Sequence, residues 1–181
     1  MRYDIMYLMN YIYEYDSPVG RLTVSSDGES LTGLWIAGQK YFAATLNGQR
    51  TIKKLPVFEQ VKEWLADYFE RRIPPFTPPL APSGSAFRRS VWDILLTVPY
   101  GEVITYRDIA KKIAAQTGRA TMSAQAVGGA VGHNPISIVI PCHRVVGSDG
   151  SLTGYAGGLD VKQKLLALEG ADMIQVISNS E

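Results

Sequence analysis

The chain has 181 residues, of which 46% are hydrophobic and 19% charged, and its formal net charge is +1. These values are typical of a globular protein and exclude a disordered chain. The near-neutral charge excludes a protein that holds nucleic acid mainly by covering phosphates with basic side chains, so any DNA contact must be local. A single cysteine excludes an internal disulfide framework and favours a reducing compartment.

The first sixteen residues are rich in tyrosine and methionine and lack a basic region followed by a continuous apolar stretch. They therefore do not resemble a signal peptide. No segment of the sequence has the apolar length that a bilayer-spanning helix needs. We expect a soluble, cytoplasmic protein without a membrane partner.

Residues 11–37 alternate apolar and polar side chains around turn signals at residues 17–20 and 27–28, which predicts a small antiparallel meander. Apolar residues then recur at helical spacing and predict an amphipathic helix that covers one sheet face. These residues are Val57, Val61, Trp64, Leu65, Tyr68 and Phe69. We expect this first unit to be an α+β scaffold without a catalytic cluster.

Five prolines between Ile73 and Ser85 separate the first unit from the second. Proline fixes the backbone angle φ and removes a hydrogen-bond donor, so neither a helix nor a sheet interior fits there. The segment predicts a semi-rigid linker. The predicted domains are residues 1–84, an N-terminal α+β domain that ends in the linker, and residues 85–181, a mainly helical domain.

Helical spacing returns after the linker, in a helix from Phe87 to Val98 that ends at Pro99. A capping box at residues 105–108 predicts the start of a second helix. A glycine turn at residues 117–118 separates it from a third helix over residues 123–132. Two short helices joined by a tight turn indicate a helix-turn-helix, although such pairs are also common in ordinary protein cores.

The apolar segment from Ser137 to Val146 is interrupted by Pro141 and contains Cys142, His143 and Arg144. A free thiol is only a few per cent thiolate at neutral pH, and His143 is a candidate base for it. The residues leave two interpretations of Cys142 open, a reactive thiol or a buried structural residue. A lone cysteine after an apolar strand is often a buried structural residue, and neighbouring side chains of an extended chain point apart.

Metal and nucleotide sites receive no support from the sequence. One cysteine and two histidines, His133 and His143, cannot build the usual closed zinc site. The glycines from Gly154 to Gly158 lack the strand, helix and spacing of a dinucleotide fingerprint. We expect no metal and no cofactor. Glu169 is either a solvated charge or, if it is buried near His143, the group that holds the imidazole tautomer.

Four separated segments of the second unit carry a resemblance to one family. They are FRRSVWDILLTVPYGEVITYRDIA (87–110), AVGGAVGHNP (126–135), IPCHRVVG (140–147) and GYAGGLDVKQKLLALEG (154–170). In this order, and with PCHRV at residues 141–145, the chain resembles the O6-alkylguanine-DNA alkyltransferases. The first unit is similar in outline to that family's variable N-terminal domain. The resemblance implies an α+β fold: a small ribonuclease-H-like domain followed by a mainly helical domain with a helix-turn-helix.

The resemblance also implies an activity. The protein would transfer a methyl or alkyl group from O6 of guanine, and from O4 of thymine, in DNA to Cys142, once per molecule and without a cofactor. Cys142 would be the nucleophile. His143, acting through a water and oriented by Glu169, would remove the thiol proton. Asn134 would support the turn that carries the cysteine, and Tyr106 would donate toward N3 of the guanine.

The same resemblance gives a substrate-binding set: Tyr106, Val145, Tyr155, Ala156 and Gly157. The backbone carbonyls of Cys142 and Val145 would accept from the exocyclic amine of the base. The backbone of Tyr155 and Ala156 would close the pocket over O6.

The implied partner is double-stranded DNA that contains O6-alkylguanine, bound by a monomer through the minor groove, with the target base rotated out of the stack. The implied DNA-contact residues are Arg107, Ser123, Ala124, Gln125 and Ala126, the small ones allowing close approach to the groove. One departure concerns the intercalating position, which is usually arginine in that family and is Gln125 here. Glutamine lacks the charge and the planar stacking surface of a guanidinium, so we expect altered base flipping or DNA affinity.

Three alternatives stay open on the sequence alone. A binding-only relative would lack the cysteine of the PCHR motif, and Cys142 is present. A transcriptional regulator with Cys142 as an alkylation sensor would need an effector domain. A cysteine hydrolase would use Cys142, His143 and a carboxylate, and it would regenerate its thiol.

Overall fold

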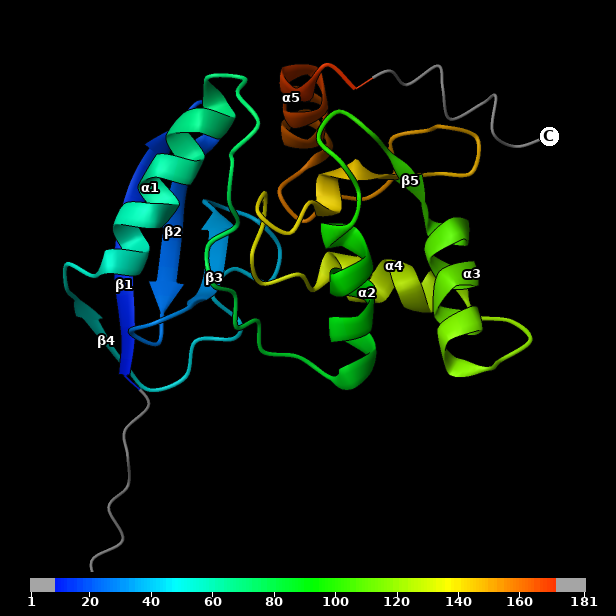
Figure 1. Ribbon diagram of the computed structural model, residues 1–181, viewed down its shortest axis with the longest axis horizontal. Coiled ribbons are helices and arrows are strands. Elements are labelled where there is room, and N and C mark those ends of the chain that lie inside the picture. The colour runs from blue at the N-terminus through cyan, green and yellow to red at the C-terminus, as the bar shows by residue number, and fades with distance from the viewer. Residues whose placement is uncertain (1–8, 172–181) are drawn as a thin grey trace, which may run out of the picture.

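The computed structural model describes residues 9–171, in which a sheet unit and a helical unit lie side by side (Figure 1). The sheet has the strand order β3-β2-β1-β4. Its strands are β1 (Met9–Ser17), β2 (Gly20–Ser26), β3 (Leu31–Ile36) and β4 (Gln49–Ile52). The first three pair antiparallel, which confirms the predicted meander. Strand β4, which pairs parallel with β1, was not predicted.

Helix α1 (Pro56–Phe69) covers one face of this sheet, as its spacing predicted (Figure 1). Its apolar side chains face the strands: Phe58 is 1% exposed, and its ring lies 5.8 Å from that of Tyr13 on β1. Burial of a side chain of this size stabilises the fold by about 1.5–3 kcal/mol. Tyr68, on the last turn, is fully buried, and its hydroxyl reaches beyond the sheet unit.

The proline-rich linker contains neither a helix nor a strand, as predicted, but it does not run free. The amide of Leu31, on the edge strand β3, donates to Pro79 O at 2.7 Å, and the amide of Ala81 donates to Leu31 O at 2.9 Å. The linker therefore covers part of the sheet edge, which protects the unpaired backbone groups of that edge. The boundary at residue 84 stays a prediction.

The second unit contains the predicted helices. Its elements are α2 (Ala86–Leu96), β5 (Ile104–Thr105), α3 (Tyr106–Thr117), α4 (Ala124–Gly132), η1 (Cys142–Arg144), β6 (Val145–Val146) and α5 (Leu159–Glu169). Thr105 is the predicted N-cap of α3, because its side chain accepts from the Asp108 amide at 3.1 Å, but the Asp108 carboxylate accepts from the Thr105 hydroxyl at 2.6 Å and not from the Thr105 amide that a full capping box uses. Gly118 ends α3 with φ 65° and leads to α4, which confirms the helix-turn-helix. Within residues 9–171, no helix combines the length and the apolar character needed to cross a membrane.

The apolar run that precedes the cysteine does not form a strand. Residues 137–140 form a turn in which Ile138 has φ 71°, and the short 3-10 helix η1 follows. The amide of Ile140 donates to Ile136 O at 3.0 Å and closes the turn. Every residue from 136 to 146 is buried, so the continuous apolar run reflects burial and not the strand period.

The two units are joined through the middle of β3. The amide of Leu34 donates to Pro135 O at 2.9 Å, and the amide of Ser137 donates to Leu34 O at 2.8 Å. The turn that precedes Cys142 is thus held against the edge of the N-terminal sheet. A continuous apolar core runs through both units. The position of the cysteine is therefore set by both units.

The N-terminal cap of α3 gives a test of this fold. Thr105→Ala removes a cap that accepts from an orphan amide, so we expect the free energy of unfolding to fall by about 1 kcal/mol. Urea unfolding measures this change, with the exposed Thr121→Ala as the matched control. An unchanged midpoint in Thr105→Ala would show that the cap contributes nothing to stability.

Candidate active site

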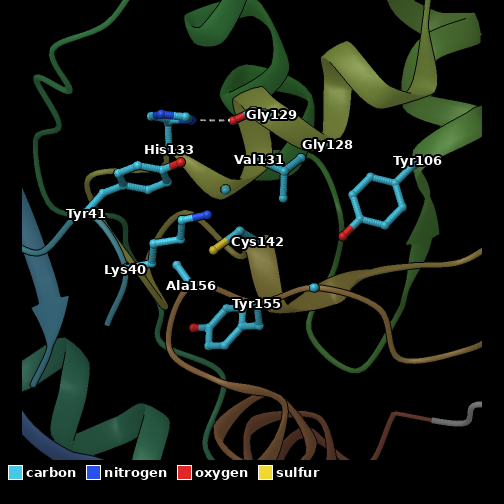
Figure 2. Close-up of a pocket in the computed structure, with 12 residues that line it drawn as sticks. Lys40, Tyr41, Tyr106, Gly128, Gly129, Val131, His133, Cys142, Tyr155 and Ala156 are labelled. Atoms are coloured by element: carbon cyan, nitrogen blue, oxygen red, sulfur yellow. Dashed lines mark hydrogen bonds between the residues drawn. The ribbon is translucent and has the colours of Figure 1, made fainter. Parts of the chain in front are cut away.

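Cys142 begins η1, and its side chain points into a cavity of about 330 Å³ (Figure 2). The cavity is bounded by both units of the chain. Lys40 and Tyr41 come from the loop after β3, while Gly128 comes from α4 and Ala156 from the loop before α5. The residue itself is 4% exposed. Its thiol is therefore withdrawn from bulk water but faces a space large enough for a small ligand.

The side-chain amide of Asn134 fixes the turn that carries the thiol. Its Nδ2 donates to Ile140 O at 2.8 Å and lies 3.1 Å from Cys142 Sγ, while its Oδ1 accepts from the Ile136 amide at 3.0 Å. The oxygen and the nitrogen of this one buried side chain thus hold the segment from Asn134 to Cys142 in its turn. A donor beside the sulfur stabilises its ionised form.

His143 is fully buried and is held by a carboxylate. Its Nε2 lies 2.6 Å from Glu169 Oε1, so in the neutral ring this nitrogen carries the proton and donates it to the carboxylate. The other ring nitrogen, Nδ1, has no hydrogen-bond partner among residues 9–171. It is left as an acceptor with a free lone pair, which is the form that a general base needs.

Glu169 accepts five hydrogen bonds in all. Arg144 binds it through two nitrogens, Nε to Oε2 at 2.8 Å and Nη2 to Oε1 at 3.0 Å. The Gly101 amide donates to Oε2 at 3.1 Å, and the Tyr68 hydroxyl donates to Oε1 at 2.7 Å. Since Tyr68 lies on α1, the prediction that the N-terminal unit is only a scaffold was wrong. The signal for Tyr68 in the sequence was its place on the apolar face of α1, which is equally typical of a core residue.

The pKa shifts follow from burial and from this network. Burial alone would raise the pKa of Glu169, but the hydrogen bonds and charges of His143 and Arg144 outweigh it and lower the pKa to about 2. Burial lowers the pKa of His143, which its bond to Glu169 opposes only in part. Burial raises the pKa of the Cys142 thiol, although the Asn134 amide and the charge of Lys162 oppose it. At neutral pH the resting site therefore holds a thiol, a neutral imidazole and a carboxylate.

Lys162, on α5, is a second residue that sequence reasoning missed. It is fully buried, and its Nζ donates to the carbonyls of Val145 at 2.5 Å, Thr153 at 2.9 Å and Gly154 at 3.2 Å. Burial lowers its pKa to about 8. The lysine ties the strand after η1 to the loop that passes over the cavity. In sequence it is one of two lysines on this helix, and nothing marks it as buried.

The predicted substrate-binding residues divide into two groups. Tyr106, Tyr155 and Ala156 line the cavity, and the Tyr106 hydroxyl donates to Thr153 O at 3.1 Å (Figure 2). Val145 and Gly157 lie outside the cavity lining. The carbonyl of Val145 already accepts from a lysine, although a carbonyl oxygen has a second lone pair.

The predicted DNA-contact residues lie on the helix-turn-helix. Ser123 caps α4 and accepts from the Ala126 amide at 3.2 Å, and residues 123–126 are exposed, as is Arg107 on α3. Gly128, about one helical turn after Gln125, lines the cavity. One helix thus presents its first turn to solvent and its next turn to the cavity. Among residues 9–171, no group of three or more histidine, cysteine, aspartate and glutamate side chains is arranged to hold a metal ion.

Comparison with known families gives two matches along the chain. Residues 10–82 match the family model described as the ribonuclease-like domain of 6-O-methylguanine DNA methyltransferase. Residues 86–171 match the one described as the DNA binding domain of the same protein. Together with the α+β architecture, these matches confirm the predicted fold class.

Individual relatives agree. A methylated-DNA–protein-cysteine methyltransferase of Haemophilus influenzae is 43% identical over 91% of this chain and 88% of that protein. One from Methanosarcina acetivorans is 40% identical over 87% of this chain and 96% of that protein. A crystal structure of Mycobacterium tuberculosis OGT in complex with DNA has a TM-score of 0.76 and 38% identity, and the match covers 93% of this chain and 98% of that one. By its sequence and by its fold, the chain belongs to the 6-O-methylguanine DNA methyltransferase family.

Proposed function

We propose that this chain repairs DNA by transferring a methyl or larger alkyl group from O6 of guanine, and from O4 of thymine, to Cys142. The observation that carries the proposal is the geometry around the chain's single cysteine. Its thiol faces a cavity bounded by the helix-turn-helix, and the next residue is a histidine held by a buried carboxylate. The relatives of this chain are named for transfer from methylated DNA to a protein cysteine.

The first step is removal of the thiol proton. Only the thiolate is nucleophilic, and burial raises the pKa of Cys142, so the reaction needs a base. His143 Nδ1 takes the proton through one water molecule. The imidazolium that forms is stabilised by the Glu169 carboxylate on Nε2, as the acidic member stabilises it in nucleophilic triads.

The second step is an in-line displacement at the alkyl carbon. The S–C bond forms as the C–O6 bond breaks, and the electron pair of that bond moves onto the guanine. The Tyr106 hydroxyl, which lines the cavity, turns from Thr153 O and donates toward N3 as this negative charge develops. A thioether is a poor leaving group, so Cys142 is consumed and each molecule repairs one lesion.

The base is held by backbone groups of the cavity wall. The carbonyls of Cys142 and Val145 accept from the exocyclic amine, and the Tyr155–Ala156 backbone covers O6. Support for this placement comes from Tyr155 and Ala156, which line the cavity beside the thiol. Gly157 acts indirectly, because a β-carbon at this position would lie only 2.8 Å from the Tyr155 ring.

DNA approaches from the side of α4, as a duplex that contains O6-alkylguanine and binds a monomer through its minor groove. The exposed first turn of α4 supports this proposal, since small residues there let the helix lie close to the groove. The target base rotates into the cavity, because the alkyl carbon is inaccessible within the duplex. We place the reaction in the cytoplasm, where reducing conditions keep the thiol free.

Intact-protein mass after incubation with a duplex that contains O6-methylguanine tests the proposed function. We expect a gain of one methyl group per molecule, which peptide mapping places on Cys142. The variant Cys142→Ala should gain nothing. A lesion that stays bound with no mass gain would favour a binding-only protein, and repeated turnover with a free thiol would favour a hydrolase.

The variant Gln125→Arg tests the effect of having glutamine on α4 where the family usually has arginine. A guanidinium adds a charge and a stacking surface, so we expect the affinity for lesion-containing DNA to rise by up to about tenfold, with the rate on the free base O6-methylguanine unchanged. Fluorescence anisotropy measures the affinity, and the exposed Lys111→Arg on α3 is the matched control. Equal affinity and equal repair rates in Gln125→Arg and the wild type would contradict a role for this position in flipping.

A further inference from the structure

The loop between β3 and β4 brings the N-terminal unit to the mouth of the cavity. Lys40 and Tyr41, on this loop, line the cavity together with Cys142 (Figure 2). The family roles set out above use only residues of the second unit. The loop therefore forms one wall of the cavity, and none of the residue roles described above uses this wall.

Two sets of hydrogen bonds hold the loop in place. The side chain of Gln39 is 6% exposed, and its Oε1 accepts from the Ile36 amide at 2.7 Å and from Ser137 Oγ at 3.0 Å. The amide of Lys40 donates to Ala156 O at 2.8 Å. The loop is thus attached both to the turn that carries the cysteine and to the segment that closes the cavity. Both attachments lie at adjacent residues directly before Tyr41, so this part of the wall is preorganised for a ligand.

Tyr41 ends this wall with an aromatic pair. Its ring stacks on that of His133 with centroids 4.0 Å apart and an angle of 21° between the ring planes. His133 Nδ1 lies 2.7 Å from Gly129 O, which holds the imidazole in this orientation. Tyr41 has φ 59°, an uncommon conformation for a tyrosine. Such strain persists where the surroundings impose it, and it is typical of ligand-contacting segments.

The position of this pair relative to the thiol indicates what it would contact. Figure 2 shows Tyr106 on one side of Cys142 and the pair Tyr41 and His133 on the other. If Tyr106 donates to the ring of the guanine, the base fills the Tyr106 side of the cavity. The atoms of a large alkyl group extend away from the base and then lie on the Lys40–Tyr41 side of the cavity.

We propose that the Tyr41–His133 pair is the contact surface for large, aromatic adducts and raises the rate of their transfer relative to methyl. This inference rests on the proposed transfer to Cys142 and adds a specificity determinant from the N-terminal unit. A benzyl ring reaches the pair and packs against it. A methyl group ends at the reacting carbon and does not touch it.

Single-turnover rate constants on two duplexes that differ only in O6-methylguanine or O6-benzylguanine test this proposal. The benzyl-to-methyl ratio cancels differences in DNA binding and in the active fraction of each preparation. We expect Tyr41→Ala to lower the ratio by about two- to tenfold, the range of one lost aromatic contact, and Tyr41→Phe to keep it. His133→Ala, which removes the stacking partner, should lower it as well.

Phe42→Ala is the matched control. Phe42 is the next aromatic residue of the loop and is 42% exposed against 40% for Tyr41, but its ring faces Trp35 and does not line the cavity. This variant should keep the wild-type ratio. An unchanged or increased ratio in Tyr41→Ala would overturn the inference, as would a wild type that accepts methyl but not benzyl. No transfer of either group to Cys142 would instead overturn the proposed function itself.

Discussion

The carboxylate of Glu169 is the group on which both the fold and the site depend. Taking a carboxylate out of water costs several kcal/mol unless it is fully hydrogen-bonded and paired with a positive charge. Here four residues satisfy it, among them Arg144 through two nitrogens, Gly101 through its amide, and Tyr68 from the N-terminal helix. One of the five hydrogen bonds to this carboxylate comes from the first unit, so docking of the two units completes the set. The carboxylate makes the two units one structure at the point where the chemistry takes place.

The hydrogen bonds that the buried carboxylate needs also determine the protonation states of the reactive groups. A carboxylate with so many donors keeps a pKa of about 2, so it stays ionised and holds the proton of His143 on Nε2. The second nitrogen is then left with a free lone pair, and burial favours the neutral thiol of Cys142. In the mechanism that we propose, this nitrogen is the base that removes the thiol proton. Such a site protects its thiol from solvent and from unwanted oxidation, and it suits a cysteine that is used once.

Much of this organisation could be predicted from the sequence, because it is local. The meander, the helix at residues 56–69 and the caps at Thr105 and Gly118 follow from spacing and turn chemistry, and the structure has them. The strand β4 was missed because residues 49–52 show little alternation, and their pairing with β1 depends on a long connection. The turn at Cys142 was missed because a fully buried segment loses the period that separates a strand from other structures. Tyr68 and Lys162 were missed because their partners are remote in sequence, and only the tertiary fold brings them together.

We propose that the buried, neutral thiol of Cys142 depends on His143 for the removal of its proton. The pH dependence of the rate at which Cys142 gains a methyl group from O6-methylguanine in DNA tests it most directly, in the wild type and in folded His143→Ala. Because burial lowers the pKa of His143 below its ordinary value, its base form predominates at neutral pH, so the wild-type rate should be nearly flat from neutral toward alkaline pH. The variant should react slowly at neutral pH and gain about tenfold per pH unit, since only the rare thiolate then reacts. A flat profile with an undiminished rate in His143→Ala would contradict the account.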